Sequence, residues 1–148
     1  MIYNKKRYKQ LLLLSEDLNY KGKTLFEENR KKYIELMEYQ KVIEEEIFWN
    51  NKQKFILIME DFLYGVINFT EFETSFTLLY YKTREKFNTF KTDLKEIENF
   101  QPSTRLNRCS NYVIAIFREF EAVKDEYCTE KDLQNYVEKV YLKFQKFK

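Results

Sequence analysis

The side chains that could act as acid, base or nucleophile form an incomplete set in this chain. Histidine is absent, so no side chain has an ordinary pKa close to neutrality. A serine or cysteine nucleophile needs an adjacent base, and the remaining lysine and carboxylate groups belong to no catalytic motif. We therefore expect a protein that is not an enzyme.

Metal and cofactor sites are not predicted either. The consecutive residues Glu44, Glu45 and Glu46 would fan around a helix instead of converging, which is typical of a solvated face. Gly22 and Gly65 lie in neither a GxGxxG nor a GxxxxGK pattern, so no phosphate-binding loop is indicated. We expect no metal and no cofactor.

Cys109 and Cys128 are the two cysteines, and they form no CxxC motif. One interpretation is a disulfide between packed helices. A lone pair of this kind more often consists of two buried thiols in a reducing compartment, and we favour that interpretation.

Helical periodicity runs through most of the sequence, which has only 2 glycines and 1 proline among its 148 residues. A basic stretch followed by four leucines predicts a short helix before Gly22. The segment 91–102 is predicted to be a loop or a short helical turn. The other predicted helices cover 24–49, 52–64, 70–90, a range from Ser103 or Thr104 to 127, and 129–147.

Helix starts are predicted by capping boxes, in which a threonine hydroxyl accepts a backbone N–H and an acidic side chain reaches back. Gly65 is placed to end the 52–64 helix in the left-handed conformation, which costs glycine little. The capping pairs are Thr24 with Glu27, Thr70 with Glu73, and Thr129 with Asp132.

These elements predict an all-α protein folded as an antiparallel helical bundle. Residues 52–148 are expected to supply its four core helices, and residues 1–51 an N-terminal helical extension. A chain of 148 residues is long enough to build a core without a disulfide or a metal.

Composition bears on the compartment. No apolar run approaches the roughly 20 residues of a membrane span, and the four leucines at 11–14 are too few for a signal peptide. The abundance of Lys, Asn, Ile, Tyr and Phe is the residue set that A/T-rich codons encode. We expect a cytoplasmic protein, with the interior of a plastid or another organelle as the alternative.

The aromatic residues, 14 Phe and 12 Tyr, raise the question of a nucleic-acid partner. The net charge of +2 is small, and the phenylalanines fall on core faces at helical spacing, which argues against such binding. Several tyrosines have weaker core assignments and fit a protein interface better. These are Tyr3, Tyr8, Tyr20, Tyr39, Tyr81 and Tyr112.

One hairpin carries a family resemblance. The corner Phe62-Leu-Tyr-Gly-Val-Ile67 and the pair Glu71-Phe72 resemble the colicin D type of bacterial immunity proteins, also called self-protective colicin-like immunity proteins. The segment from Thr129 to Leu133, followed by valines, is similar to the start of that family's last helix. The resemblance covers about residues 52–147.

The resemblance implies a small helical bundle that binds the tRNA-cleaving domain of a bacteriocin and occludes its active site. Acidic side chains would then stand where tRNA phosphates lie, and a basic cleft would attract them. The implied partner-binding residues are Glu60, Asp61, Glu71 and Glu73, with a second group of Glu119, Glu121 and Asp125. The alternatives are a helical interaction or regulatory protein with another partner, and a weak nucleic-acid binder.

Overall fold

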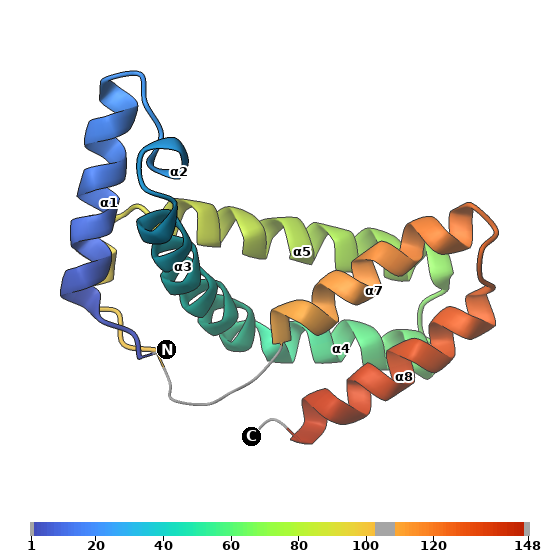
Figure 1. Cartoon of the computed structure of the whole chain (residues 1–148). Helices are drawn as coiled ribbons and strands as arrows, with labels where there is room; N and C mark the ends of the chain where they lie inside the picture. The colour runs from blue at the N-terminus through green and yellow to red at the C-terminus, as the bar shows by residue number, and fades with distance from the viewer. Residues whose placement is uncertain (1, 103–108, 147–148) are drawn as a thin grey trace. The chain divides into compact units, whose positions relative to one another are not determined.

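The computed structural model describes residues 2–102 and 109–146. Across these residues the protein is all-helical, with eight helices and no strand, as the sequence predicted (Figure 1). The helix start predicted at Ser103 or Thr104 lies outside the described residues, as does the predicted helix end at 147.

The chain divides into two compact units, each built from two stretches of sequence. The first unit comprises Met1–Glu46 and Lys86–Thr104, and the second comprises Ile47–Glu85 and Arg105–Lys148. The division predicted at residue 51 stays a prediction.

The first unit contains α1 (Lys5–Tyr20), α2 (Leu25–Glu28), most of α3 (Arg30–Asn50) and α6 (Leu94–Glu98). Asn4 caps α1 by accepting the Arg7 N–H at 3.0 Å. Arg7 also makes a two-pronged ion pair with Glu35 of α3, at 2.8 and 2.9 Å. This fork-to-fork geometry fixes the spacing of α1 and α3.

Tyrosines fill part of the first unit's core, which the sequence did not predict. Tyr8 is fully buried, and its hydroxyl donates a hydrogen bond to the Lys91 carbonyl. Tyr39 is 5% exposed and packs near the rings of Tyr3 and Tyr8. The weak core assignment of Tyr8 and Tyr39 was therefore wrong. Tyr8 can bury its ring because its hydroxyl has the Lys91 carbonyl as a partner.

The predicted 24–49 helix is interrupted near its start. Thr24 does accept the Glu27 N–H at 3.2 Å, but α2 ends after one turn at Asn29, whose φ of −155° is extended. Asn29 then accepts the Lys32 N–H at 3.1 Å and so caps α3. The prediction of one continuous helix was wrong, because the Asn29 side chain offers the backbone an alternative hydrogen bond.

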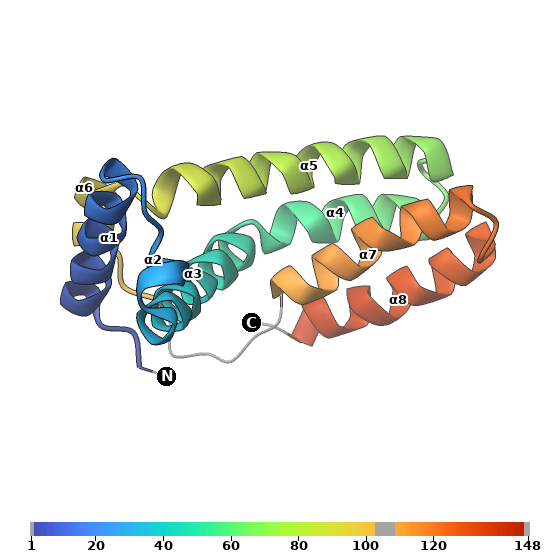
Figure 2. The same ribbon diagram turned by 45° about the horizontal axis from the view of Figure 1, so that its top comes forward.

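The second unit contains α4 (Lys52–Leu63), most of α5 (Phe69–Phe90), α7 (Cys109–Lys124) and α8 (Glu130–Lys146). These helices lie alongside one another (Figure 2), and α8 packs against both α4 and α7. Phenylalanine rings from α4, α5 and α7 meet in the core. The distances between ring centroids are 4.3 Å for Phe62 and Phe72, 5.2 Å for Phe55 and Phe76, and 5.7 Å for Phe76 and Phe120.

Both cysteines are free thiols in the second unit. Cys109 is buried and lies 3.6 Å from the Phe48 carbonyl oxygen, whereas Cys128 is partly buried and lies 3.7 Å from a Glu119 carboxylate oxygen. The disulfide alternative is thereby excluded. None of the described helices is both long enough and apolar enough to traverse a bilayer.

Candidate functional site

The turn between α4 and α5 is a glycine-capped corner, as the sequence predicted. Gly65 has a φ of +74°, and its N–H donates to the Phe62 carbonyl at 3.2 Å. The Val66 N–H donates to the Asp61 carbonyl at 2.8 Å. These two bonds satisfy the last free carbonyls of α4 in the pattern of a Schellman motif.

The capping residue of α5 lies two residues before the predicted one. Asn68 and Glu71 form the capping box: the Glu71 N–H donates to Asn68 Oδ1 at 2.9 Å, and the Asn68 N–H donates to Glu71 Oε1 at 3.2 Å. The pair Thr70 with Glu73 was the wrong choice, because Asn68 caps as well as a threonine does and lies nearer the Gly65 corner.

The second corner, between α7 and α8, has the same backbone pattern. The Glu126 N–H donates to the Val123 carbonyl at 3.2 Å, and the Tyr127 N–H donates to the Ala122 carbonyl at 2.9 Å. Glu126 has a φ of +62° and is the one non-glycine residue with positive φ among those described. A glutamate therefore occupies a backbone position that glycine would adopt with less strain.

Helix α8 then begins with the predicted cap. The Asp132 N–H donates to Thr129 Oγ1 at 3.1 Å, and the Thr129 N–H donates to Asp132 Oδ2 at 2.9 Å. The hydrogen bonds from Thr129 lower the pKa of the Asp132 carboxyl below its ordinary value.

The two corners lie at the same end of the second unit (Figures 1 and 2). An ion pair at 2.5 Å joins Lys124 of α7 to Glu73 of α5, and Lys124 also lies 4.0 Å from Glu121. The hydrogen bond to Glu73 and its charge raise the pKa of Lys124. Residues far apart in sequence, around 60–73 and 118–132, are thus brought together; we call them the two-corner end.

The four predicted binding residues all belong to the two-corner end, but they differ in what they contact. Glu60 is partly buried and accepts a hydrogen bond from the Tyr141 hydroxyl at 3.0 Å. Glu71 and Glu73 have the capping and ion-pair roles given above. Asp61 is exposed, and its carboxylate makes no hydrogen bond or ion pair with another described residue.

The two-corner end is strongly acidic although the whole chain has a net charge of +2. Residues 60–73 include four carboxylates and no Lys or Arg, and residues 118–132 include six carboxylates against three basic side chains. Each of these carboxylate residues is exposed or partly exposed. Sequence reasoning found most of them but missed Glu126, Glu130 and Asp132 as part of one surface.

Helix dipoles account for only some of these charges. Glu71, Glu130 and Asp132 lie in first helical turns, where the positive end of the dipole stabilises them. Asp61 and Glu121 instead lie in the last turns of α4 and α7, where the dipole disfavours a negative charge. The helix dipole therefore does not account for the carboxylates at these two helix ends.

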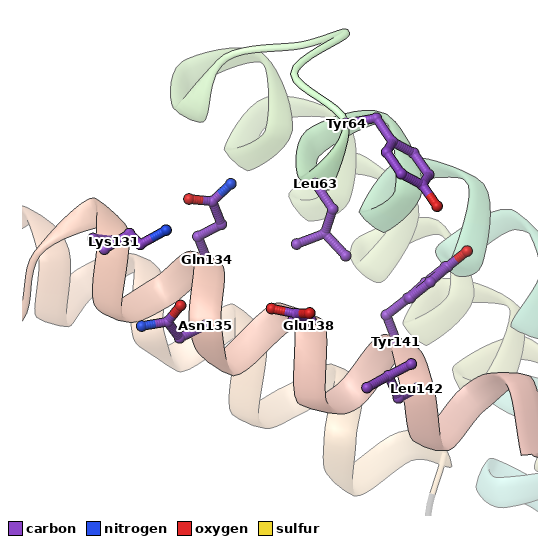
Figure 3. A pocket seen from close by; sticks show the side chains of 8 residues that line it. All are labelled: Leu63, Tyr64, Lys131, Gln134, Asn135, Glu138, Tyr141 and Leu142. Atoms are coloured by element: carbon purple, nitrogen blue, oxygen red, sulfur yellow. The ribbon is translucent and has the colours of Figure 1, made fainter.

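A pocket of about 280 Å³ opens at the edge of the two-corner end, between the end of α4 and one face of α8 (Figure 3), and Leu63, Tyr64 and Lys131 belong to both. Leu63 at the end of α4 and Tyr64, the residue that follows the helix, border it on one side, and Tyr141 and Leu142 of α8 on the other. The α8 face also contributes polar side chains. These are Lys131, Gln134, Asn135 and Glu138.

Tyr141 is held firmly as one wall of this pocket. Its hydroxyl donates to Glu60 and accepts a hydrogen bond from Gln145 Nε2 at 2.7 Å. Burial, together with the hydrogen bond and charge of Glu60, raises the pKa of the Tyr141 hydroxyl. This pocket could not be predicted from the sequence, because it depends on which face of α8 meets α4.

The first unit has a larger hollow of about 530 Å³ between α1, α2 and α3. Its lining is mainly apolar and includes Leu12, Phe26 and Met37. Glu16 and Glu27 border it, but no comparable gathering of like charges surrounds it.

Potential metal ligands do not gather anywhere in residues 2–102 and 109–146: no three Cys, Asp or Glu side chains are placed to hold an ion. Comparison of the chain with protein-family models, with curated proteins and with solved structures finds no match.

Proposed function

We propose that this protein is a non-catalytic binding protein whose two-corner end binds a basic protein domain. Its most specific form is immunity: inhibition of a tRNA-cleaving toxin by occlusion of the active site, in the cytoplasm where such a toxin meets its substrate. The colicin-like hairpin supports this form, which also assumes that the second unit is an antiparallel bundle of four core helices.

The observation that carries the proposal is the charge of the two-corner end. The two-corner end has ten carboxylates and three basic side chains, although the net charge of the whole chain is +2. A surface of one sign attracts a partner of the other sign and raises the association rate, an effect that salt weakens. Repulsion of phosphates at the same end argues against nucleic acid as the ligand of this surface.

Glu126 supports the proposal independently. Non-glycine residues held in strained backbone conformations are found most often at functional sites. Glycine would relieve the strain at the second corner but would remove one charge from the acidic surface.

The test begins with recovery of the tagged full-length chain from its native cells at low salt, followed by elution at higher salt. We expect a stoichiometric basic RNase domain whose cleavage of tRNA is inhibited in the complex. A partner without a basic surface, or an RNase that stays fully active when bound, would contradict the proposal.

Charge reversal locates the binding surface. Asp61→Lys combined with Asp125→Lys should weaken binding of that RNase domain by about tenfold or more at low salt. Both residues are exposed, so the fold should be retained. The control is Glu85→Lys, which reverses the charge of an exposed glutamate outside the two-corner end. It should leave the affinity for the RNase domain within about twofold of the wild-type value.

A further inference from the structure

The face of α8 that borders the pocket adjoins the face that packs in the core. The core face is made by Leu133, Val137, Val140 and Phe144, all at most 2% exposed, and Tyr141, which is 9% exposed, belongs to both faces. The pocket residues recur at intervals of three and four along the helix, which places them on one stripe. Leu142 on this stripe is 51% exposed, and Tyr64 opposite is 73% exposed. Large apolar side chains are thus presented to solvent beside the acidic surface.

We infer that this pocket binds one arginine side chain of the basic partner. The inference rests on the proposed function in one respect: it takes the partner to be a basic protein. The volume of about 280 Å³ is just below the roughly 300–1,000 Å³ of small-molecule sites, and so suits a single long side chain.

The lining matches the two parts of an arginine side chain. Leu63 and Leu142 offer apolar surface to the aliphatic stem, and Tyr64 and Tyr141, which also line the pocket (Figure 3), are aromatic rings of the kind on which a guanidinium stacks. Glu138 supplies a carboxylate acceptor for its N–H groups. Lysine fits less well, because its ammonium is compact and strongly hydrated and does not stack on a ring.

Charge sets the orientation of the bound side chain. Lys131 lies at one end of the stripe and repels a cation, whereas Glu138 lies about two helical turns away, next to Tyr141. Glu60, which accepts the Tyr141 hydrogen bond, adds a second negative charge on that side. The guanidinium therefore lies towards Glu138 and Tyr141.

The test uses N-acetyl-arginine amide as the probe and the full-length ¹⁵N-labelled chain. We expect saturable amide shifts confined to residues 63–64 and 131–142, with a dissociation constant on the order of 10 mM. N-acetyl-lysine amide should bind about threefold more weakly or worse. Absence of shifts with the arginine probe, or equal shifts with the lysine probe, would overturn the inference.

Two pairs of variants assign the shifts to the pocket. Tyr64→Ala should weaken the arginine probe about threefold, and Tyr127→Ala, which removes another exposed tyrosine outside the lining, should not. Glu138→Gln should also weaken it about threefold, whereas Glu130→Gln on the same helix should have no effect. Equal effects within either pair would contradict a specific site.

The outcomes separate this inference from the proposed function. The probe experiment requires no partner. If the probe binds but the Asp61 and Asp125 variants do not weaken the RNase complex, the proposed function alone is refuted. A charge-sensitive RNase complex without probe binding would refute the pocket alone.

Discussion

At the scale of single residues, the two corners solve the same backbone problem with different side chains. Gly65 and Glu126 both have positive φ, and both end a helix by donating to carbonyls of its last turn. The sequence revealed the first corner, because glycine there has a known conformational meaning. The second corner could not be predicted in this way, because glutamate has no preference for the left-handed conformation.

Substitutions at the two corner residues should have opposite effects on the stability of the second unit. Gly65→Ala should destabilise the second unit by about 1 kcal/mol, and Gly65→Asn by less, because asparagine tolerates the left-handed region. Glu126→Gly should stabilise it by up to about 1 kcal/mol. Urea unfolding measures all three variants; a loss of stability in Glu126→Gly would show that its backbone is not strained.

Asp132 should make stability depend on acid. Because its folded pKa is lowered, its contribution is present above the ordinary carboxyl pKa of about 3.9 and is lost as the pH falls through the lower folded value. The thermal midpoint of wild type should therefore exceed that of Asp132→Asn at about pH 6, and the gap should close near pH 2. Glu130→Gln is the charge-matched control, and an unchanged gap at both pH values would contradict the assignment.

At the scale of elements, periodic apolar residues predicted most helices correctly, and local polar residues decided where they end. The caps at Thr24 and Thr129 were predicted correctly. The failures were at Asn29 and Asn68, since asparagine caps a helix without the Thr-x-x-Glu signature. The acidic residues of the site were visible singly, but only tertiary packing brings the two corners together.

The start of α5 gives a direct test of the observed cap. Asn68→Ala should destabilise the protein by about 1 kcal/mol, because it leaves the Glu71 N–H without its acceptor. Thr70→Ala, the substitution at the position that the sequence favoured, should change stability by less than about 0.5 kcal/mol. A larger loss in Thr70→Ala than in Asn68→Ala would restore the sequence-based cap.

At the scale of the whole molecule, each unit has its own core and the second is dominated by aromatic rings. Phe76 is fully buried and lies within 5.7 Å, centroid to centroid, of the rings of Phe55, Phe72 and Phe120. The pairing of sequence stretches into units could not be read from periodicity, which reports the buried face of a helix but not its neighbour.

Phe76→Ala should destabilise the second unit by about 3–5 kcal/mol through the cavity it leaves. Leu78→Ala, on the exposed side of the same helix, should cost less than about 1 kcal/mol. Trp49, the single tryptophan, is 7% exposed and assigned to the second unit, so its fluorescence reports the unfolding. Equal losses in the two variants would contradict the described core.

The division of the first unit into two stretches has a consequence for biosynthesis. Its first stretch ends at Glu46, but the residues that complete it extend to Thr104. At a translation rate of about 5–20 residues per second, the ribosome needs about 3–12 s to supply them. During that interval Tyr8, which is fully buried in the folded protein, lacks the Lys91 carbonyl to which its hydroxyl donates. Chaperones that bind emerging apolar segments would therefore have their longest opportunity at the N-terminal helix.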